Sequence, residues 1–399
     1  MLSSKIGLSI ADEKKYVAVL FFLFAAQIMS WVPRFPEVKA NLGISNGEFG
    51  TYVSFGSIGS IVALIITGHL VHKYGAKVVL IFAATGMCLT ASIIVHLNSA
   101  SIFIILQIFN GAVISAFNVA VNAQAFHAQD RAGVMIMSRQ HGFWTAGAVS
   151  TAVLSGILVS FVGISLHINV LSAILLIAIL IYIKKLDPEI IKPSRTKEDN
   201  FRFTELFTSF RIDGLVSLAF ICAILVEFAT ADWSAIYAKE TIGVSGSLAT
   251  VPYIVAFIAM IVGRLGIHKV TPYIPLQKMV KIGSLVGGFG FIGFILASSM
   301  LVDYSKNLAF LSAILGFAIG GLGSSFLSPT LFTAANLRST QNSAVIVGQM
   351  GVVNAFLVLI MKTVIAWTAQ FTGSVAIALV IPGLMLISVA FMSRVAKGI

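Results

Sequence analysis

Residues 171–183 read LSAILLIAILIYI, an apolar run without a charged side chain. A helix needs about 20 mostly apolar residues to cross a bilayer, and in hydrocarbon only helices or closed barrels satisfy their backbone hydrogen bonds. A membrane barrel would show apolar and polar residues in alternation, which this run does not. The run therefore predicts a transmembrane helix.

Similar apolar runs follow one another along the whole chain, bounded by charged residues, prolines or polar clusters. They predict twelve spans, at residues 16–33, 48–70, 77–97, 101–122, 139–162, 165–183, 212–236, 248–268, 279–299, 306–330, 341–365 and 371–393. A long hydrophilic stretch near the midpoint separates the sixth span from the seventh. We therefore predict an all-α membrane protein with an N-terminal six-helix bundle at 1–184, a cytoplasmic central loop at 185–211 and a C-terminal six-helix bundle at 212–399.

The composition agrees with this class. Of the 399 residues, 58% are hydrophobic and 10% charged, which is not the balance of a soluble globular protein. The net charge of +11 is spread over short loops instead of gathering with aromatic residues, so we expect no nucleic-acid partner. Cys88 and Cys222 each lie alone within an apolar run, which predicts neither a disulfide nor a metal site.

The basic residues favour one orientation in the membrane. If the N-terminus is cytoplasmic, most of the 26 Lys and Arg residues fall in cytoplasmic segments. The segments outside then hold Arg34, Lys39, Lys239 and Lys306. Lys362 remains in a span, close enough to the outer boundary to extend its ammonium there. Because cytoplasmic loops are enriched in Lys and Arg, we predict an inner or plasma membrane protein with both termini in the cytoplasm.

Sequence motifs for ATP, nucleotide or metal chemistry do not point to an enzyme. No segment fits the phosphate-binding pattern G-x-x-x-x-G-K-[ST], so ATP is not the expected energy source. Gly288, Gly290 and Gly293 match the spacing of a dinucleotide fingerprint, but they lie inside an apolar span and indicate helix packing. His69 and His72 have no third ligand nearby in the sequence. We expect no cofactor and no metal.

Acids at membrane depth are the informative residues. A charge in hydrocarbon costs at least about 2.5 kcal/mol and persists mainly where it faces a polar interior. Glu227 and Asp232 lie in the seventh predicted span, and Glu227 lies deeper. We predict that both take part in proton coupling, with Glu227 as the main proton site. The alternative for each is a structural partner of another buried polar group.

Amide, aromatic and other polar residues within or beside the spans are candidates for substrate binding. Amides supply donors and acceptors, and rings stack on apolar ligand faces, which suits an uncharged or zwitterionic hydroxyl-rich solute. Asn118 and Asn122 are one helical turn apart and share a face. The predicted set comprises Gln27, Trp31, Arg34, Asn118, Asn122, Gln124, His141, Trp144, Trp233, Tyr237, Gln349 and Asn354. The alternative for a single amide is an interhelical hydrogen bond, and for His141 a role at the start of its helix.

Two features suggest a duplicated transporter. The step Gln-x-Gly occurs at residues 140–142 and again at 349–351, at the same place in each half. The loop after the second span contains Gly68, His72, Lys73, Gly75 and Lys77, which resembles the pattern G-x-x-x-D-[RK]-x-G-x-[RK] of the major facilitator superfamily. His72 stands where that family usually has an acid, which puts the usual acid-to-helix contact in doubt. Gly263 and Arg264 resemble a decayed second copy.

Other stretches resemble a bacterial subgroup of that family related to the fucose-permease branch. They are residues 31–36 (WVPRFP), 118–124 (NVAVNAQ), 141–144 (HGFW) and 232–234 (DWS). Many relatives would have an acid at position 118, and its replacement by Asn118 shifts the proton role toward Glu227. Residues 142–150 contain no proline, unlike the Gly-Pro signature of drug–proton antiporters.

We therefore expect a monomeric secondary transporter that moves a small polar solute, sugar-like or otherwise hydroxylated, by alternating access. Proton symport is the expected coupling, so the partners are the solute, protons and the lipid bilayer. A proton-coupled exporter of drugs or metabolites is one alternative. A membrane-embedded sensor or enzyme is an alternative from another class.

Overall fold

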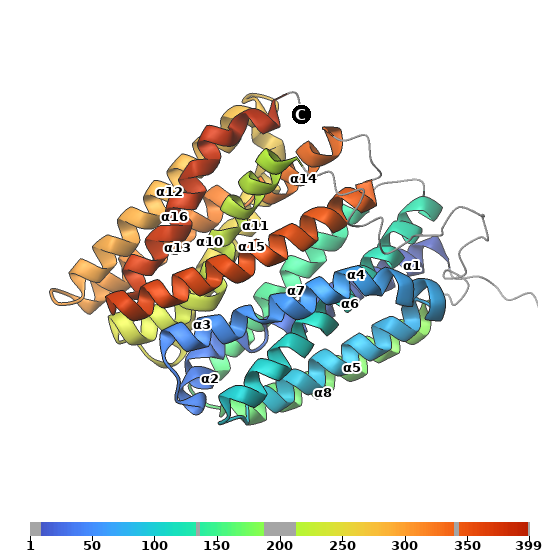
Figure 1. Cartoon of the computed structure of the whole chain (residues 1–399), viewed down its shortest axis with the longest axis horizontal. Helices are drawn as coiled ribbons and strands as arrows, with labels where there is room; N and C mark the ends of the chain where they lie inside the picture. The colour runs from blue at the N-terminus through green and yellow to red at the C-terminus, as the bar shows by residue number, and fades with distance from the viewer. Residues whose placement is uncertain (1–8, 133–135, 187–212, 339–342, 398–399) are drawn as a thin grey trace, which may run out of the picture.

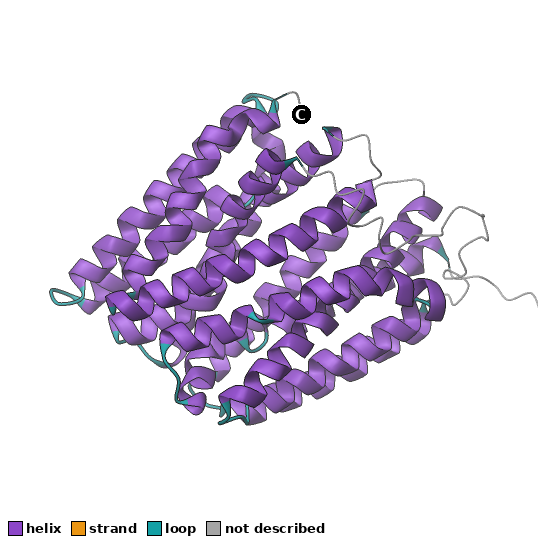
Figure 2. Cartoon of the chain, in the orientation of Figure 1, coloured by secondary structure: helices purple, strands orange, loops and turns teal. Residues whose placement is uncertain are grey.

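The computed structural model describes residues 9–132, 136–186, 213–338 and 343–397. Within these ranges the regular secondary structure is helical, with loops and turns between the helices (Figures 1 and 2). Eleven segments in these ranges are long and apolar enough to cross a membrane. Because the bilayer offers no hydrogen-bonding partners, each such segment must satisfy its backbone internally, as a helix does. The predicted all-α membrane class is confirmed at this level.

The first half of the chain consists of long helices joined by turns and short helical segments. Their bounds are α1 (Ile10–Met29), η1 (Val32–Arg34), α2 (Phe35–Leu42), α3 (Asn46–Ser54), α4 (Gly56–Tyr74), α5 (Ala76–Ile94), α6 (Ala100–Ala132), α7 (Met137–Leu158) and α8 (Ile164–Lys185). Helix α1 packs on α7 and α8, while α6 packs on α4 and α5. Gly75 ends α4 with a φ of 88°, a conformation that favours glycine, and the chain turns there directly into α5.

The second half repeats this pattern of long helices. Its elements are α10 (Gly214–Ile236), the π-helical turn η3 (Tyr237–Ile242), η4 (Gly246–Thr250), α11 (Val251–Val270), α12 (Leu276–Leu301), α13 (Lys306–Ser324), α14 (Leu327–Leu337), α15 (Ser343–Thr372), α16 (Val375–Met392) and η5 (Ser393–Ala396). Helix α12 packs on α13 and α16, and α10 packs on α14, α15 and α16. The predicted central loop lies almost entirely outside the described residues, at 187–212.

Helix α7 occupies the position of the fifth predicted span, but it is not among the eleven apolar segments. It is 22 residues long and begins with Met-Ser-Arg-Gln-His. Helices α1 and α11 pack against it. The count of twelve spans therefore stays a prediction. Two other predicted spans, 101–122 and 341–365, end too early, since α6 continues to Ala132 and α15 to Thr372.

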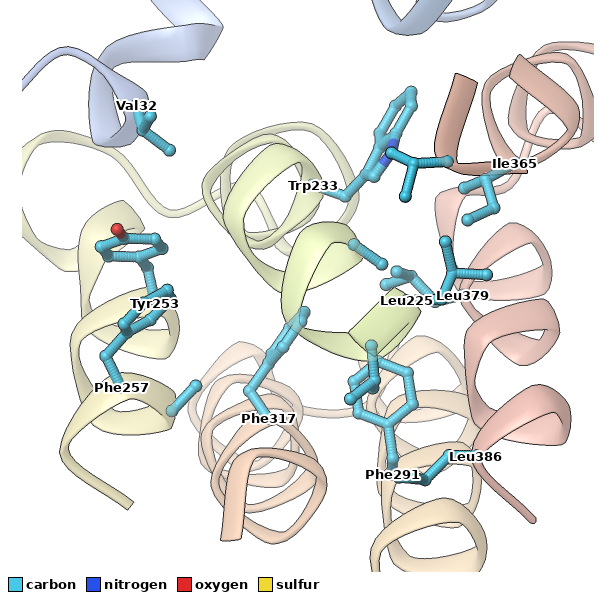
Figure 3. Close-up of a cluster of buried hydrophobic side chains, with 14 of the residues drawn as sticks. Val32, Leu225, Trp233, Tyr253, Phe257, Phe291, Phe317, Ile365, Leu379 and Leu386 are labelled. Atoms are coloured by element: carbon cyan, nitrogen blue, oxygen red, sulfur yellow. The ribbon is translucent and has the colours of Figure 1, made fainter. Parts of the chain in front are cut away.

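Two buried clusters of apolar side chains hold the helices together. One is built from residues of the first half alone, including Phe21, Phe117 and Ile179. The other surrounds α10, where Trp233 and Leu225 pack against side chains of the neighbouring second-half helices (Figure 3). This second cluster also takes in residues of the first half, among them Trp31, Val32, Phe35 and Phe49. This second cluster, which we call the merged core, therefore joins the two halves at one end of the molecule.

That end is the side opposite the one where α1 begins and α16 ends (Figure 1). We call the two ends the opposite side and the terminal side. On the opposite side, the Lys39 Nζ lies 2.6 Å from the Glu240 carboxylate. The hydroxyls of Ser160 and Ser247 are 3.0 Å apart, and those of Ser54 and Thr363 are 3.1 Å apart. These pairs each join the first half of the chain to the second.

Close backbone approach supports the same contact. A Cβ atom added at Gly50 of α3 would lie 2.4 Å from the Cβ of Ala366 on α15 and 2.9 Å from the Trp233 ring. A Cβ at Gly156 of α7 would lie 2.4 Å from the Thr250 hydroxyl. Such distances leave no room for a larger residue, so glycine lets α3 and α7 lie directly against the second half.

Candidate functional site

Asp232 of α10 forms an ion pair between neighbouring helices. Its carboxylate lies 2.7 Å from the Nζ of Lys362 on α15, and both side chains are almost buried. The Lys362 ammonium also lies over the Phe228 ring, 4.9 Å from its centroid. The expectation that Lys362 extends to the outer boundary is wrong, because an opposite charge on α10 makes its burial tolerable.

Glu227 lies on the same helix and has a looser partner. Its carboxylate is 3.4 Å from an Nη2 atom of Arg264 on α11, near the upper limit for a hydrogen bond. The Arg264 Nε donates to the backbone carbonyl of Ser325 at 2.9 Å. The side chains of Glu227 and Arg264 remain 25% and 30% exposed. This pair is therefore accessible, unlike Asp232–Lys362.

His141 comes from the first half, near the start of α7. Its ring meets Phe21 edge-on, with centroids 5.5 Å apart, and the residue is exposed. His141 lies on α7, and α7 packs against α11, the helix that carries Arg264. This packing puts two of the predicted residues, His141 and Glu227, on helices that both contact α11.

Asn118 and Asn122 share a face of α6, as predicted from their spacing. The Asn122 Nδ2 donates to the Asn118 backbone carbonyl at 2.8 Å and also contacts the Asn118 side-chain oxygen. Asn118 is exposed. It lies about two and a half turns from Phe109, which is also exposed, so the two side chains point to opposite sides of α6. The amide pair therefore faces away from the apolar surface that Phe109 marks.

Three further amides are buried. Gln124 of α6 and Asn354 of α15 are 1% and 5% exposed, and neither side chain has a hydrogen-bond partner among the described residues. A buried amide without a partner is costly, so these two are candidates for a polar ligand or for water. Gln349 of α15 is buried as well.

The predicted residues at the end of the first span serve the packing of the first half. The Gln27 amide donates to the Ser172 hydroxyl of α8 at 3.0 Å. Arg34 is buried and donates to the Glu37 carboxylate at 2.7 Å and to the Val162 carbonyl at 2.9 Å. Trp31 packs edge-on against Phe35. The structure places these residues away from Glu227 and Arg264, within the merged core or beside α8.

The aromatic candidates are also core residues. Trp144 packs against the core of the first half, and Trp233 is buried in the merged core beside Gly50. Tyr237 donates from its hydroxyl to the backbone carbonyl of Ile295 at 3.1 Å and is fully buried. Tyr237 is the first residue of η3 and therefore contributes to the packing of η3 on α12.

The residues of the predicted loop motif surround the turn between α4 and α5. The Lys77 Nζ lies 3.3 Å from the backbone carbonyl of Lys184 at the end of α8. Lys73 places its ammonium over the Tyr74 ring, 5.1 Å from the centroid. Gly68 faces open space, and the side chain of His72 is outside the described part. Lys77 thus satisfies a free carbonyl at a helix end.

Two groups of residues were missed as site candidates. Arg264 lies inside the predicted span 248–268, a position that should have marked it as intramembrane, and it was interpreted only as part of a loop motif. Glu13 of α1 is fully buried and pairs with Arg131 at 2.8 Å and His127 at 3.1 Å, both on α6. Glu13 precedes the first predicted span, so the sequence carried no signal for its burial.

This fold, with eleven segments of the described chain long and apolar enough to cross a membrane, is that of a multi-pass membrane protein. A model of the Major Facilitator Superfamily matches residues 17–361. The chain therefore belongs to this family, whose members are transporters and not enzymes.

Similar proteins support the assignment. An uncharacterized MFS-type transporter of Yersinia pestis is 29% identical, with 94% of this chain and 93% of that protein covered. Membrane protein MosC of Rhizobium meliloti is 24% identical over 82% of this chain and 77% of its own length. Among solved structures, the nucleoside transporter NupG has a TM-score of 0.68 at 14% identity, covering 96% of this chain and 100% of NupG. A partially occluded inward-open structure of the xylose transporter XylE from E. coli also has a TM-score of 0.68, at 13% identity and 96% coverage of each chain.

Proposed function

We propose that the chain moves a small polar solute, sugar-like or otherwise hydroxylated, by alternating access and in symport with protons. The solved structures that share its fold include a nucleoside transporter and a D-xylose–proton symporter. The exposed Asn118–Asn122 pair and the buried amides Gln124 and Asn354 supply the donors and acceptors that hydroxyl groups require.

The observation that carries the proton coupling is the loose contact of Glu227 with Arg264. A carboxylate held at 3.4 Å and 25% exposed can take up a proton without breaking a tight ion pair. Asp232 is held at 2.7 Å by Lys362 and is better suited to a structural role. We therefore place proton exchange on Glu227, with Asp232 keeping Lys362 neutralised.

The proposed setting is the inner or plasma membrane, with the terminal side in the cytoplasm. The distribution of Lys and Arg along the sequence supports this orientation. The halves are joined on the opposite side by Lys39–Glu240 and by the hydroxyl pairs, so the proposed state is closed toward the exterior.

The test uses purified protein in liposomes loaded with a pH-sensitive dye. A panel of sugars, nucleosides and hydroxylated nutrients is added, and proton entry with the solute is recorded. We expect Glu227→Gln to abolish proton entry and concentrative uptake, while exchange of labelled for unlabelled solute continues, because exchange needs no net proton movement. The control is Asp303→Asn, which removes an exposed acid between α12 and α13.

Unchanged accumulation by the Glu227→Gln variant would contradict the proton role. Loss of both accumulation and exchange, with Asp303→Asn active, would place Glu227 in solute binding instead.

A further inference from the structure

Arg264 of α11 is a partly exposed cation whose hydrogen-bond donors are only partly used. Its Nε donates to the Ser325 carbonyl, and its Nη2 donates to the Glu227 carboxylate. Its Nη1 donates to no described residue. A guanidinium presents five N–H donors in a planar fork that matches a carboxylate. Arg264 thus has unused donors at a position where 30% of the side chain is exposed.

A second nitrogen donor comes from the other half of the chain. His141 is exposed and lies on α7, which packs against α11, the helix that carries Arg264. An imidazole and a guanidinium on neighbouring helices both favour an anion between them. Of the two acids on α10, Asp232 is neutralised by Lys362, so Glu227 alone competes for Arg264.

We propose that the solute is a hydroxylated carboxylate, a sugar acid, whose carboxylate is bound by Arg264 with His141 as the contact from the first half. This inference rests on the proposed function, because Glu227 is the proton site in both. When Glu227 is ionised it holds Arg264. When Glu227 takes up a proton, the ion pair is lost and the guanidinium is free for the carboxylate of the solute.

Binding of the anion is then linked to uptake of one proton. Affinity rises as the pH falls, because protonated Glu227 no longer competes for Arg264. Of the charged and titratable groups around Glu227, Arg264 on α11 contacts it directly. Tyr253 is on the same helix as Arg264, the Asp232–Lys362 pair joins α10 to α15, and His141 is on α7, which packs against α11. Helices α14 and α16 carry no charged residue, and α13 carries only Lys306, at its opposite-side end.

A second consequence is electrical. One anion of charge −1 and one proton cross together, so each cycle moves no net charge. Uptake is then driven by the pH gradient and does not respond to a membrane potential imposed at equal pH. A neutral solute carried with a proton would respond to both.

The test measures binding to the purified full-length protein by calorimetry at pH 6 and pH 8. The probes are matched pairs, D-galacturonate with D-galactose, D-glucuronate with D-glucose, and D-gluconate with D-sorbitol. We expect at least one acid to bind about tenfold or more tightly than its neutral counterpart, and more tightly at pH 6 than at pH 8. Arg264→Gln should lose this affinity, Arg264→Lys should regain part of it, and Glu227→Gln should bind the acid with a weaker dependence on pH.

The control Lys269→Gln removes an exposed positive charge from the same helix and should leave binding unchanged. The proposal is overturned if no acid in the panel binds, if a neutral sugar binds as tightly as its acid, or if Arg264→Gln keeps the affinity while folding normally. If a neutral sugar is taken up with protons through Glu227, the proposed function stands and only the inference of a sugar acid fails. If an acid binds in an Arg264-dependent way but Glu227→Gln leaves accumulation unchanged, the inference of a sugar acid stands and the proton role of Glu227 fails.

Discussion

At the scale of single residues, α10 holds two acids that differ in how firmly they are paired. Asp232 and Lys362 are 2.7 Å apart and almost buried, whereas Glu227 and Arg264 are 3.4 Å apart and partly exposed. A buried ion pair is costly to break because the remaining charge has no water to solvate it. The tight pair therefore fits a structural role, and the loose pair a functional one.

Single removal of either charge of the tight pair should destabilise the protein. We expect Lys362→Met or Asp232→Asn to cost about 3–5 kcal/mol, because each leaves an uncompensated buried charge. The double variant should recover much of the loss, since it leaves no charge behind. Melting temperatures of the purified variants measure this. If the double variant loses as much stability as the two single variants together, the two side chains do not interact.

At the scale of helices, the contact between α3 and α15 depends on a small residue. Gly50 approaches Ala366 so closely that a Cβ would lie 2.4 Å from the alanine methyl group. Its neighbour Ser54 continues the contact through the Thr363 hydroxyl. Helices that pack in a membrane without a hydrophobic driving force gain stability from such close approach. In the proposed transport cycle, this contact keeps the opposite side shut.

Enlarging Gly50 should open that side. We expect Gly50→Leu to force α3 away from α15, at a cost of about 1–3 kcal/mol for the overpacked state. A cysteine at position 54, where serine is buried, should then react faster with a water-soluble maleimide. Gly293→Leu serves as control, because a Cβ at Gly293 meets nothing within 4 Å. An unchanged labelling rate would show that this contact does not control access.

At the scale of the whole molecule, the two halves meet mainly through the merged core and the polar pairs of the opposite side. Alternating access requires these contacts to separate while the terminal side closes. Ser160 in the turn between α7 and α8 and Ser247 in η4 lie on either side of this junction, with their hydroxyl oxygens 3.0 Å apart.

A disulfide across the junction should stop transport. In the variant S160C/S247C the sulfur atoms replace two oxygens already in contact, so oxidation should link the halves. We expect solute exchange to be abolished after oxidation and restored by a reductant. The single variants are the controls, and the native Cys88 and Cys222 are both buried and free. Full exchange in the oxidised, cross-linked protein would contradict movement at this junction.

The sequence by itself determined that the chain is helical and lies in a membrane, because the need for internal backbone hydrogen bonds in lipid acts on each segment separately. It also placed Asn118 and Asn122 on one face and Glu227 and Asp232 at depth, since helical periodicity is local. Only the tertiary structure decided that Lys362 pairs with Asp232, that Arg264 pairs with Glu227, and that Arg34 and Tyr237 belong to the packing. Periodicity states which side chains share a face of one helix, but it does not state which other helix that face will meet.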